Sequence, residues 1–269
     1  MPFSVATWNI NSVRLRMPLV ERLLLERAPD VLCLQETKCP DELFPFDRFH
    51  ALGYRHVEIH GQKGYHGVAT VSRRPLEVVE RRRFCDIADC RHLSVRVEAG
   101  GRSILVHNFY VPAGGDEPDP DINPKFRHKL GFVSEMNAVP AEFDDRSGSI
   151  LVGDLNIAPL EHDVWSHKQL LKVVSHTPQE TERLNDLLSG GHGWVDLVRK
   201  HVPHDQKLYS WWSYRSANWE LADKGRRLDH IWSSENLVPG LKDIDILRDA
   251  RGWERPSDHV PVIARFDVG

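Results

Sequence analysis

Apolar residues recur along the chain in short runs that have the length of single β-strands. The runs are rich in valine, isoleucine and leucine and are bounded by turn-forming residues, a pattern typical of strands. We expect strands at Val5–Ile10, Val31–Leu34, Gly67–Ser72, Leu93–Val97, Ile104–Phe109, Ile150–Leu155, Leu228–Trp232 and Val260–Phe266.

Amphipathic helical patterns lie between some of these runs. One helix is expected to begin at Pro18, which can occupy a first helical turn, and to end before Pro29. Two more helices are predicted over Phe126–Phe143 and Glu180–Leu188. Some strands follow one another directly and others alternate with helices. This order predicts an α/β protein with many antiparallel neighbours, in which two packed sheets are covered by helices.

The domain organisation follows from length and from the lack of a linker. A chain of 269 residues with 41% hydrophobic content is long enough for one large core. No Gly/Ser-rich linker, repeat or low-complexity segment divides it, and Pro112–Pro124 is interpreted as one long functional loop. We therefore expect a single domain over residues 1–269.

Charge and cysteine content narrow the function classes. The net charge of −4 argues mildly against a protein that coats nucleic acid, although a local basic groove is compatible with it. The four cysteines form no CxxC pair, so neither zinc nor disulfides are indicated, and Cys33 is expected to be a buried thiol. The N-terminus lacks a signal-peptide pattern and no apolar segment is long enough for a bilayer. We expect a cytoplasmic protein with no membrane partner.

Polar side chains follow several of the predicted strands, which is where α/β proteins build their sites. Taken singly, an Asp or Asn at a strand end is usually an ordinary turn or cap residue. The recurrence of such residues as a set predicts a functional site, and the set comprises Asn9, Asn11, Glu36, Asn108, Tyr110, Asp154, Asn156, Asp229, Asp258 and His259.

Oxygen ligands dominate this set, which suits Mg²⁺ or Mn²⁺ better than zinc. Mg²⁺ usually takes only one or two protein carboxylates and keeps waters and substrate phosphate in its other positions. Glu36 is the best ligand candidate, and Asn9 and Asp258 nearby would complete the protein's share. The sequence therefore indicates a substrate that contains phosphate.

Several motifs together resemble the exonuclease III family of the endonuclease/exonuclease/phosphatase superfamily. They are WNIN, LQETK, GQKGYHGVA, NFYVP, GDLN, the WWSYR to RRLDHIW stretch and SDHVP, and they follow the family's order from Asn9 to His259. The resemblance implies a four-layered α/β sandwich, with two mixed β-sheets face to face and helices outside. It also implies a Mg-dependent DNA-repair nuclease, by default a monomer, that cuts duplex DNA 5′ of abasic sites and removes nucleotides or blocking groups from damaged 3′ ends.

The resemblance also implies roles for individual residues. Asp154 would orient and deprotonate the attacking water, Asn156 would hold that water or the phosphate, and Tyr110 would hydrogen bond or act as an acid near the phosphate. His259 would pair with Asp229 and act as base, acid or electrostatic clamp. Side chains of the family's metal site correspond here to Asn9, Glu36, Asp154, Asn156, Asp258 and His259.

Substrate contacts are expected from a further group of residues: Asn11, Arg14, Lys38, Asn108, Trp211 and Leu228. Trp211 and Leu228 would line a pocket for the flipped-out abasic sugar. Arg14, Arg16 and Lys38 would contact DNA phosphates, whereas Asn108 is either a phosphate ligand or an amide that caps backbone groups. Basic residues at the end of the long loop are expected to face phosphates as well: Lys125, Arg127 and Lys129.

Three positions depart from the family pattern. Some relatives have tryptophan where Arg226 stands, so the pocket here is expected to be more polar or more open. Leu155 replaces an aromatic residue of many members, and Ser213 stands where several have aspartate, which we expect to shift metal or DNA affinity modestly.

Two other classes of function remain compatible with the sequence. A phosphatase or phospholipid phosphodiesterase on the same scaffold would need a membrane-facing apolar loop, and none is apparent. A binding module that has lost its chemistry would need a damaged motif set, yet every expected catalytic position is filled.

Overall fold

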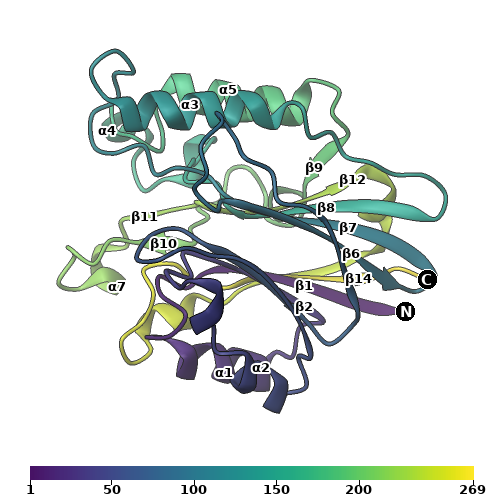
Figure 1. Ribbon diagram of the computed structural model, residues 1–269. Coiled ribbons are helices and arrows are strands. Elements are labelled where there is room, and N and C mark those ends of the chain that lie inside the picture. The colour runs from purple at the N-terminus through teal and green to yellow at the C-terminus, as the bar shows by residue number, and fades with distance from the viewer.

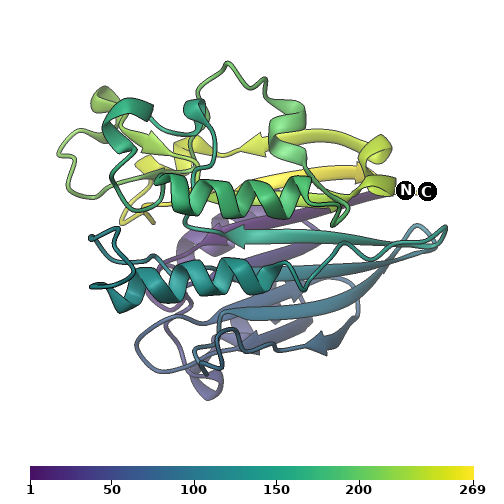
Figure 2. The ribbon, with the colours of Figure 1, turned by 90° about the horizontal axis from the view of Figure 1, so that it is seen from above.

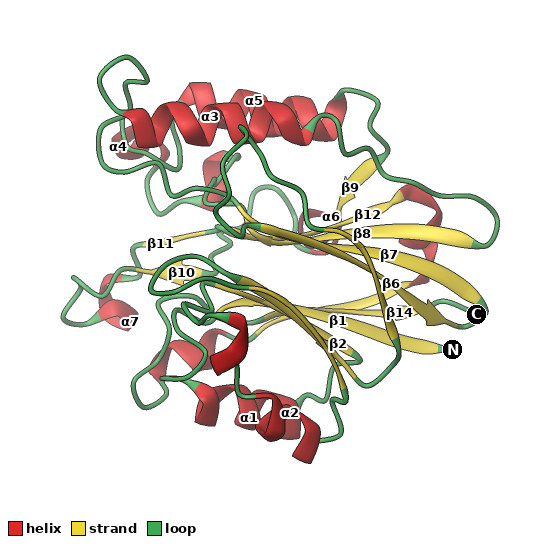
Figure 3. Cartoon of the chain, in the orientation of Figure 1, coloured by secondary structure: helices red, strands yellow, loops and turns green.

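Two β-sheets pack face to face and carry helices on their outer faces (Figure 1, Figure 3). This computed structural model describes residues 1–269. The arrangement of helix, sheet, sheet and helix confirms the four-layered α/β sandwich implied by the family resemblance. No helix is both long enough and apolar enough to cross a bilayer.

The first sheet holds both chain termini. Its strands are β1 (Pro2–Asn9), β2 (Val31–Gln35), β3 (His56–His60), β4 (Val68–Ser72), β13 (Leu241–Ile246) and β14 (Val262–Asp267). Their order is β13-β14-β1-β2-β4-β3, with β1 parallel to β2 and antiparallel to β14. Two helices cover the outer face of this sheet, α1 (Met17–Glu26) and α2 (Phe46–Ala51) (Figure 1).

The second sheet is built mainly from the middle of the chain. Its strands are β5 (Leu76–Glu80), β6 (His92–Ala99), β7 (Arg102–Tyr110), β8 (Ser147–Asp154), β9 (Trp194–Asp196) and β12 (Asp229–Ser234). Their order is β5-β6-β7-β8-β12-β9, with β7 parallel to β8. Two helices lie side by side over its outer face, α3 (Pro124–Met136) and α5 (Pro178–Ser189) (Figure 2).

Shorter elements gather at the edges of the sandwich. The strands β10 (Trp211–Trp212) and β11 (Gly225–Arg226) form a separate hairpin-like pair at one end of the sheets (Figure 1). The remaining helices are single turns or little more: α4 (His167–Leu170), α6 (Leu197–His201) and α7 (Trp219–Ala222).

Side-chain alternation along the strands divides the core into layers. In β1, Val5 faces the second sheet, whereas Ala6 and Trp8 pack under α1. In β7, Val106 faces the first sheet and Phe109 packs under α3. This period of two is expected for strands buried on both faces.

All the strands expected from the hydrophobic pattern are present, but the strands at the sheet edges were missed. Four strands absent from the prediction, β3, β5, β9 and β13, are the edge strands of the two sheets. They are mostly only half-buried, so they carry little of the continuous apolar signal. The helix predicted over Phe126–Phe143 is also too long, because it ends at Met136, shortly before the helix-breaking Pro140.

Strand direction brings the predicted polar residues to one end of the sandwich. The parallel pairs end together, so that Asn9 of β1 lies beside Gln35 of β2 and Tyr110 of β7 beside Asp154 of β8. Asp229, at the start of the antiparallel β12, is also paired with Asp154. Residues far apart in the sequence therefore meet at this end.

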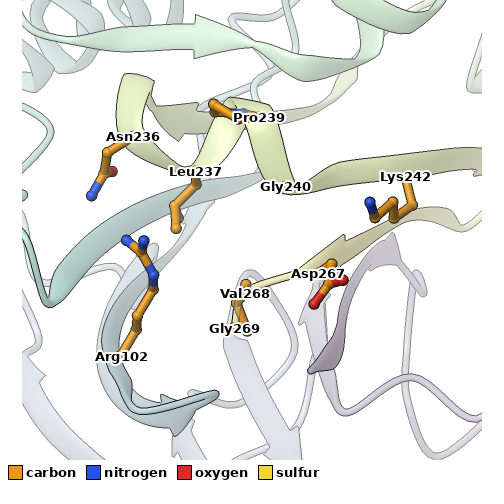
Figure 4. A pocket seen from close by; sticks show the side chains of 9 residues that line it. All are labelled: Arg102, Asn236, Leu237, Pro239, Gly240, Lys242, Asp267, Val268 and Gly269. Carbon is orange, nitrogen blue, oxygen red and sulfur yellow. The ribbon is translucent and has the colours of Figure 1, made fainter.

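The opposite end carries the chain termini and a separate pocket (Figure 1, Figure 4). There Arg102, at the start of β7, lies near Leu237 and Asp267, and Lys242 adds a second positive charge. At about 3.3 Å per residue, β7 separates Arg102 from Tyr110 by roughly 26 Å. None of the predicted site residues lines this pocket.

Gly153 permits the close approach of β7 and β8 that sets Tyr110 beside Asp154. Its φ is +147°, and a Cβ atom there would lie 1.9 Å from the carbonyl oxygen of Phe109. We predict that Gly153→Ala lowers the free energy of unfolding by about 3 kcal/mol or more, because backbone must move to accommodate the methyl group.

A suitable control is Gly101→Ala, since Gly101 also has positive φ but no atom within 4 Å of the new Cβ. It should cost only about 1 kcal/mol in urea unfolding. Equal losses in the two variants would refute the steric explanation.

Candidate active site

One buried amide joins the carboxylates that end the two sheets. Asn9, the last residue of β1, has no exposed surface. Its Nδ2 donates to Oε1 of Glu36 at 3.0 Å and to Oδ2 of Asp154 at 2.8 Å. Since one nitrogen reaches both carboxylates, Asn9 fixes their spacing across the gap between the sheets.

Glu36 follows β2 in the left-handed conformation, with φ +49°, and this turns its side chain toward the second sheet. The hydroxyl of Tyr110 donates to Oε1 at 2.8 Å, and Lys38 Nζ lies 2.8 Å from Oε2. Lys38 also donates to Oδ1 of Asn11 at 2.7 Å. Burial raises the pKa of Glu36, but Lys38 and hydrogen bonds from Asn9, Lys38 and Tyr110 outweigh it and lower the pKa below its usual value. Glu36 is therefore ionised.

Asp154 is held by the turn that follows β8. Asn156, with φ +54°, donates its backbone N–H to Oδ1 at 2.9 Å and its side-chain nitrogen to Oδ2 at 3.1 Å. The same amide nitrogen donates to the carbonyl oxygen of Val111 at 2.9 Å. Burial raises the pKa of Asp154 to about 7, although the charge of His259 acts in the opposite direction. Asp154 can therefore accept a proton near neutral pH.

His259 lies between two carboxylates. Its Nδ1 donates to Oδ2 of Asp229 at 2.9 Å, and its Nε2 lies 3.7 Å from Oδ2 of Asp154. Burial lowers the pKa of His259, but the charges of Asp229 and then Asp154 outweigh this and raise it to about 10. The ring is therefore an imidazolium near neutral pH, with Nε2 at ion-pair distance from Asp154.

Two groups at this end have the chemistry to hold a metal. Ligand atoms of Asp154, Asp229 and His259 all lie within 4.8 Å of one another. Nδ1 of His259 is already bonded to Asp229, so Nε2 is the ring atom that would serve its predicted role as a ligand, which stays a prediction. Glu36 fits a hard divalent cation better, because it is ionised, partly exposed and already faces one positive group, Lys38.

The carboxylate of Asp258 accepts hydrogen bonds from one amide side chain and one aromatic side chain. Its Oδ1 accepts from Nδ2 of Asn11 at 3.2 Å, and its Oδ2 accepts from Nε1 of Trp211 at 2.9 Å. Trp211 also forms a β-bridge with His259 and packs on a small apolar cluster that contains Leu228. The predicted pocket residues therefore lie directly beside the predicted metal ligands.

Arg226 brings a positive charge to this apolar cluster. Its guanidinium carbon lies 5.2 Å from the centroid of the Trp211 ring. Its Nη1 donates to the carbonyl oxygen of Val174 at 3.1 Å and to Oγ of Ser175 at 2.7 Å, which holds the guanidinium in place. The guanidinium of Arg226 is therefore fixed over the ring of Trp211, and the expected effect on a sugar pocket stays a prediction.

Asn108 does not reach the site. It is fully buried in β7, where its Nδ2 donates to the carbonyl oxygens of Leu34 at 3.2 Å and Ala69 at 3.0 Å. Its Oδ1 accepts from Nε2 of Gln35 at 2.7 Å. Of the two sequence interpretations, the backbone-binding amide is correct and the substrate ligand is wrong, because every polar atom of this side chain is used between the sheets.

Two predicted phosphate contacts need revision, and a third stays a prediction. Lys129 is fully buried and pairs with Glu180, so the expectation that it faces phosphates is wrong. Arg16 is largely buried, and its guanidinium binds backbone carbonyls, among them that of Asn11. Arg14 is exposed and makes no hydrogen bond to the side chains of the site, so its predicted DNA contact stays a prediction.

Two positioning residues were not foreseen. Ser257 donates its hydroxyl to the carbonyl oxygen of Asn9 at 2.7 Å and accepts the N–H of His259 at 3.2 Å, which ties β1 to the loop before β14. Ser257 is the first residue of the SDHVP motif, so the sequence could have identified it. Arg91, whose guanidinium lies 4.7 Å from the ring centroid of Tyr110, stands outside every motif that carried the prediction.

Comparison with known proteins gives consistent matches over nearly the whole chain. The profile of the endonuclease/exonuclease/phosphatase family matches residues 6–259. Exodeoxyribonuclease III of Haemophilus influenzae is 34% identical over 97% of this chain and 98% of its own. An AP endonuclease structure from Archaeoglobus fulgidus superposes with a TM-score of 0.86 at 33% identity, covering 99% and 100% of the two chains. The structure of a Neisseria 3′ phosphatase bound to a product DNA hairpin superposes with a TM-score of 0.82 at 30% identity, covering 98% and 99%.

The charge of Asp229 should govern the protonation of His259. We predict that Asp229→Asn lowers the pKa of His259 by about 2, because a neighbouring opposite charge typically shifts a pKa by 1–3. An NMR titration of the ring in metal-free buffer would measure it, with His259→Gln used to assign the signal. The exposed Asp249→Asn serves as the control. A pKa that stays near 10 in Asp229→Asn would contradict the assignment.

Proposed function

The chain belongs to the endonuclease/exonuclease/phosphatase family, and on that premise we propose that it is a Mg²⁺-dependent nuclease of DNA repair. Its substrate is duplex DNA, which it cuts 5′ of abasic sites and from whose 3′ ends it removes nucleotides or blocking groups. The activities named for the similar proteins support this substrate class, as does the DNA hairpin held by the Neisseria 3′ phosphatase.

One observation carries the proposal. An unbroken series of contacts runs from Glu36 through Asn9 and Asp154 to His259 and on to Asp229. It joins an ionised carboxylate, a carboxylate with raised pKa and an imidazolium. Hydrolysis of a phosphodiester needs a base for the water and positive groups for the charge that develops, and this series supplies both.

Asp154 acts as the base for the attacking water. Its pKa of about 7 lies close to the operating pH, where proton transfer by a general base is most efficient. Asn156 holds the carboxylate through two hydrogen bonds, so an oxygen of Asp154 keeps one orientation toward the water. The water then attacks phosphorus in line with the leaving 3′ oxygen.

His259 stabilises the negative charge that develops on the phosphate. Asp229 holds the ring by Nδ1 and keeps it protonated, so the Nε2 proton can be donated to a phosphate oxygen. Burial and the nearby Glu36 raise the pKa of Tyr110 and keep the phenol protonated, so its hydroxyl becomes a second donor to the phosphate when it turns from Oε1 of Glu36.

Glu36, Asn9 and Asp258 hold the divalent cation in this proposal. When bound, Mg²⁺ neutralises charge on the scissile phosphate and on the leaving oxygen. Their donor oxygens suit a hard ion, and Glu36 is already ionised in its absence. Lys38, whose ammonium lies 2.8 Å from Oε2 of Glu36, is the proposed contact for a DNA phosphate beside this site.

The wall formed by Trp211, Leu228 and Arg226 receives the sugar of the abasic nucleotide. Trp211 and Leu228 offer the apolar surface that a sugar without its base requires. We further propose that residues 1–269 act as a single domain, since the side chains of one site span the sequence from Asn9 to His259, and that the protein acts as a monomer.

The proposal is tested by substrate comparison. A duplex with one abasic-site analogue and a duplex with a 3′-phosphate end are incubated with Mg²⁺ or EDTA, beside a panel of phosphoinositides and sphingomyelin. We expect Mg²⁺-dependent cleavage of both DNA substrates and no reaction with the lipids. Hydrolysis of the lipid panel alone would establish the competing phosphatase or lipid phosphodiesterase.

Substitutions of Asp154 and Glu36 should change different kinetic quantities. Asp154→Asn is predicted to lower kcat by about 10²–10⁴-fold at saturating Mg²⁺, because the base for the water is lost. Glu36→Gln is predicted to raise the Mg²⁺ concentration needed for half-maximal rate by at least about tenfold, because a ligand charge is lost. The exposed Glu42→Gln is the matched control. An unchanged metal requirement in Glu36→Gln would remove that residue from the proposed metal site.

A further inference from the structure

Lys129 is a fully buried lysine on a helix whose inward face is otherwise apolar. It lies on α3 between the buried residues Phe126 and Val133 and has no exposed surface. An ammonium in this position is costly to remove from water unless each proton finds an acceptor. A charge at this position therefore requires compensating contacts.

All three protons of the Lys129 ammonium have acceptors. Nζ forms a short ion pair with Oε2 of Glu180, and it donates to the carbonyl oxygen of Asn156 at 2.8 Å and to that of Ala113 at 3.3 Å. The two carbonyls belong to the loops that leave β8 and β7. One ammonium therefore ties together the exits of two site-forming strands and the first turn of α5.

The carbonyl of Asn156 is the contact that reaches the site. Asn156 has φ +54°, and from this conformation it gives two hydrogen bonds to Asp154. Holding its carbonyl fixes the peptide plane that follows Asn156 and so restrains the backbone conformation of the residue that carries both donors. Gly114 shows how closely the other loop packs here, because a Cβ atom on it would lie 2.8 Å from Cδ of Lys129.

Glu180 holds the ammonium in turn. Its Oε1 accepts from Oγ1 of Thr177 at 2.7 Å, and both its oxygens accept the N–H of Ser175 at 3.0 Å. The oxygen of the Ser175 side chain accepts from Arg226, which lies on Trp211. The carboxylate of Glu180 therefore contacts both the lysine behind Asn156 and the segment that holds Arg226 against Trp211.

We infer that Lys129, anchored by Glu180, is a positioning residue for the hydrolytic reaction: it fixes the backbone of Asn156 and thereby the orientation of Asp154 toward the attacking water. This inference rests on the proposed function. A buried ion pair is poor evidence for stability alone, because apolar pairs often replace one at no cost. The loss of its hydrogen bonds to the two loops should instead appear in the chemical step.

The test uses Lys129→Met/Glu180→Gln, which removes the ammonium without leaving a lone buried charge and retains an oxygen for Ser175 and Thr177. On an abasic-site duplex at saturating Mg²⁺, kcat should fall by about 10- to 100-fold, because small misplacement of a reacting group is costly. KM should change less than about threefold, because Lys129 is fully buried and contacts no surface that DNA can reach.

Arg199→Met is the matched control. Arg199 is equally buried and pairs with Asp163, but its other acceptors are the carbonyl oxygens of Pro203 and Gln206, outside the site. It should lower the melting temperature and leave kcat unchanged at 25 °C. If the double variant does not fold, Lys129→Gln/Glu180→Gln replaces it, with the same split between kcat and KM expected.

Two results would overturn the inference: a folded variant with kcat within twofold of the natural protein, or an equal loss of kcat in Arg199→Met. Neither would bear on the proposed function, which fails separately if the natural protein cleaves no DNA substrate in Mg²⁺.

Discussion

The site depends on one shared hydrogen-bond donor. Nδ2 of Asn9 holds Glu36 from its own sheet and Asp154 from the facing sheet, so two carboxylates that would otherwise repel are kept apart at a fixed distance. Such an arrangement requires both sheets to end at the same level. The parallel pairing of β1 with β2 and of β7 with β8, together with the glycine that lets β7 approach β8, provides this alignment.

The surroundings of the charged groups shift their pKa values in different directions and so suit each group to a different chemical role. Lys38 keeps Glu36 ionised, burial raises the pKa of Asp154 toward neutrality, and Asp229 keeps His259 protonated. Each shift has a separate cause, so side chains a few ångströms apart can act as ligand, base and electrostatic stabiliser. The same residues on a flat, solvated surface would have ordinary pKa values and no such division.

Much of this could be predicted from the sequence, because strand ends leave a local signal. Asn9, Glu36 and Asp154 each follow an apolar run, and the run itself fixes where they lie. Edge strands such as β3 and the buried partners could not be found in this way. Lys129 resembled a groove lysine although it interrupts an apolar helical stripe, and Asn108 follows the same pattern as the strand-end residues that meet at the site. What separates these residues is contact across the sheets, which no local pattern records.

Locating the bound cation would test this account most directly. Anomalous diffraction from a crystal soaked in Mn²⁺ would identify the protein atoms around the ion without reference to activity. We expect a peak beside Glu36, within coordination distance of its carboxylate and close to Asn9 and Asp258. A single peak bound by Asp229 and His259, with Glu36 still paired to Lys38, would contradict the division of roles on which the account rests.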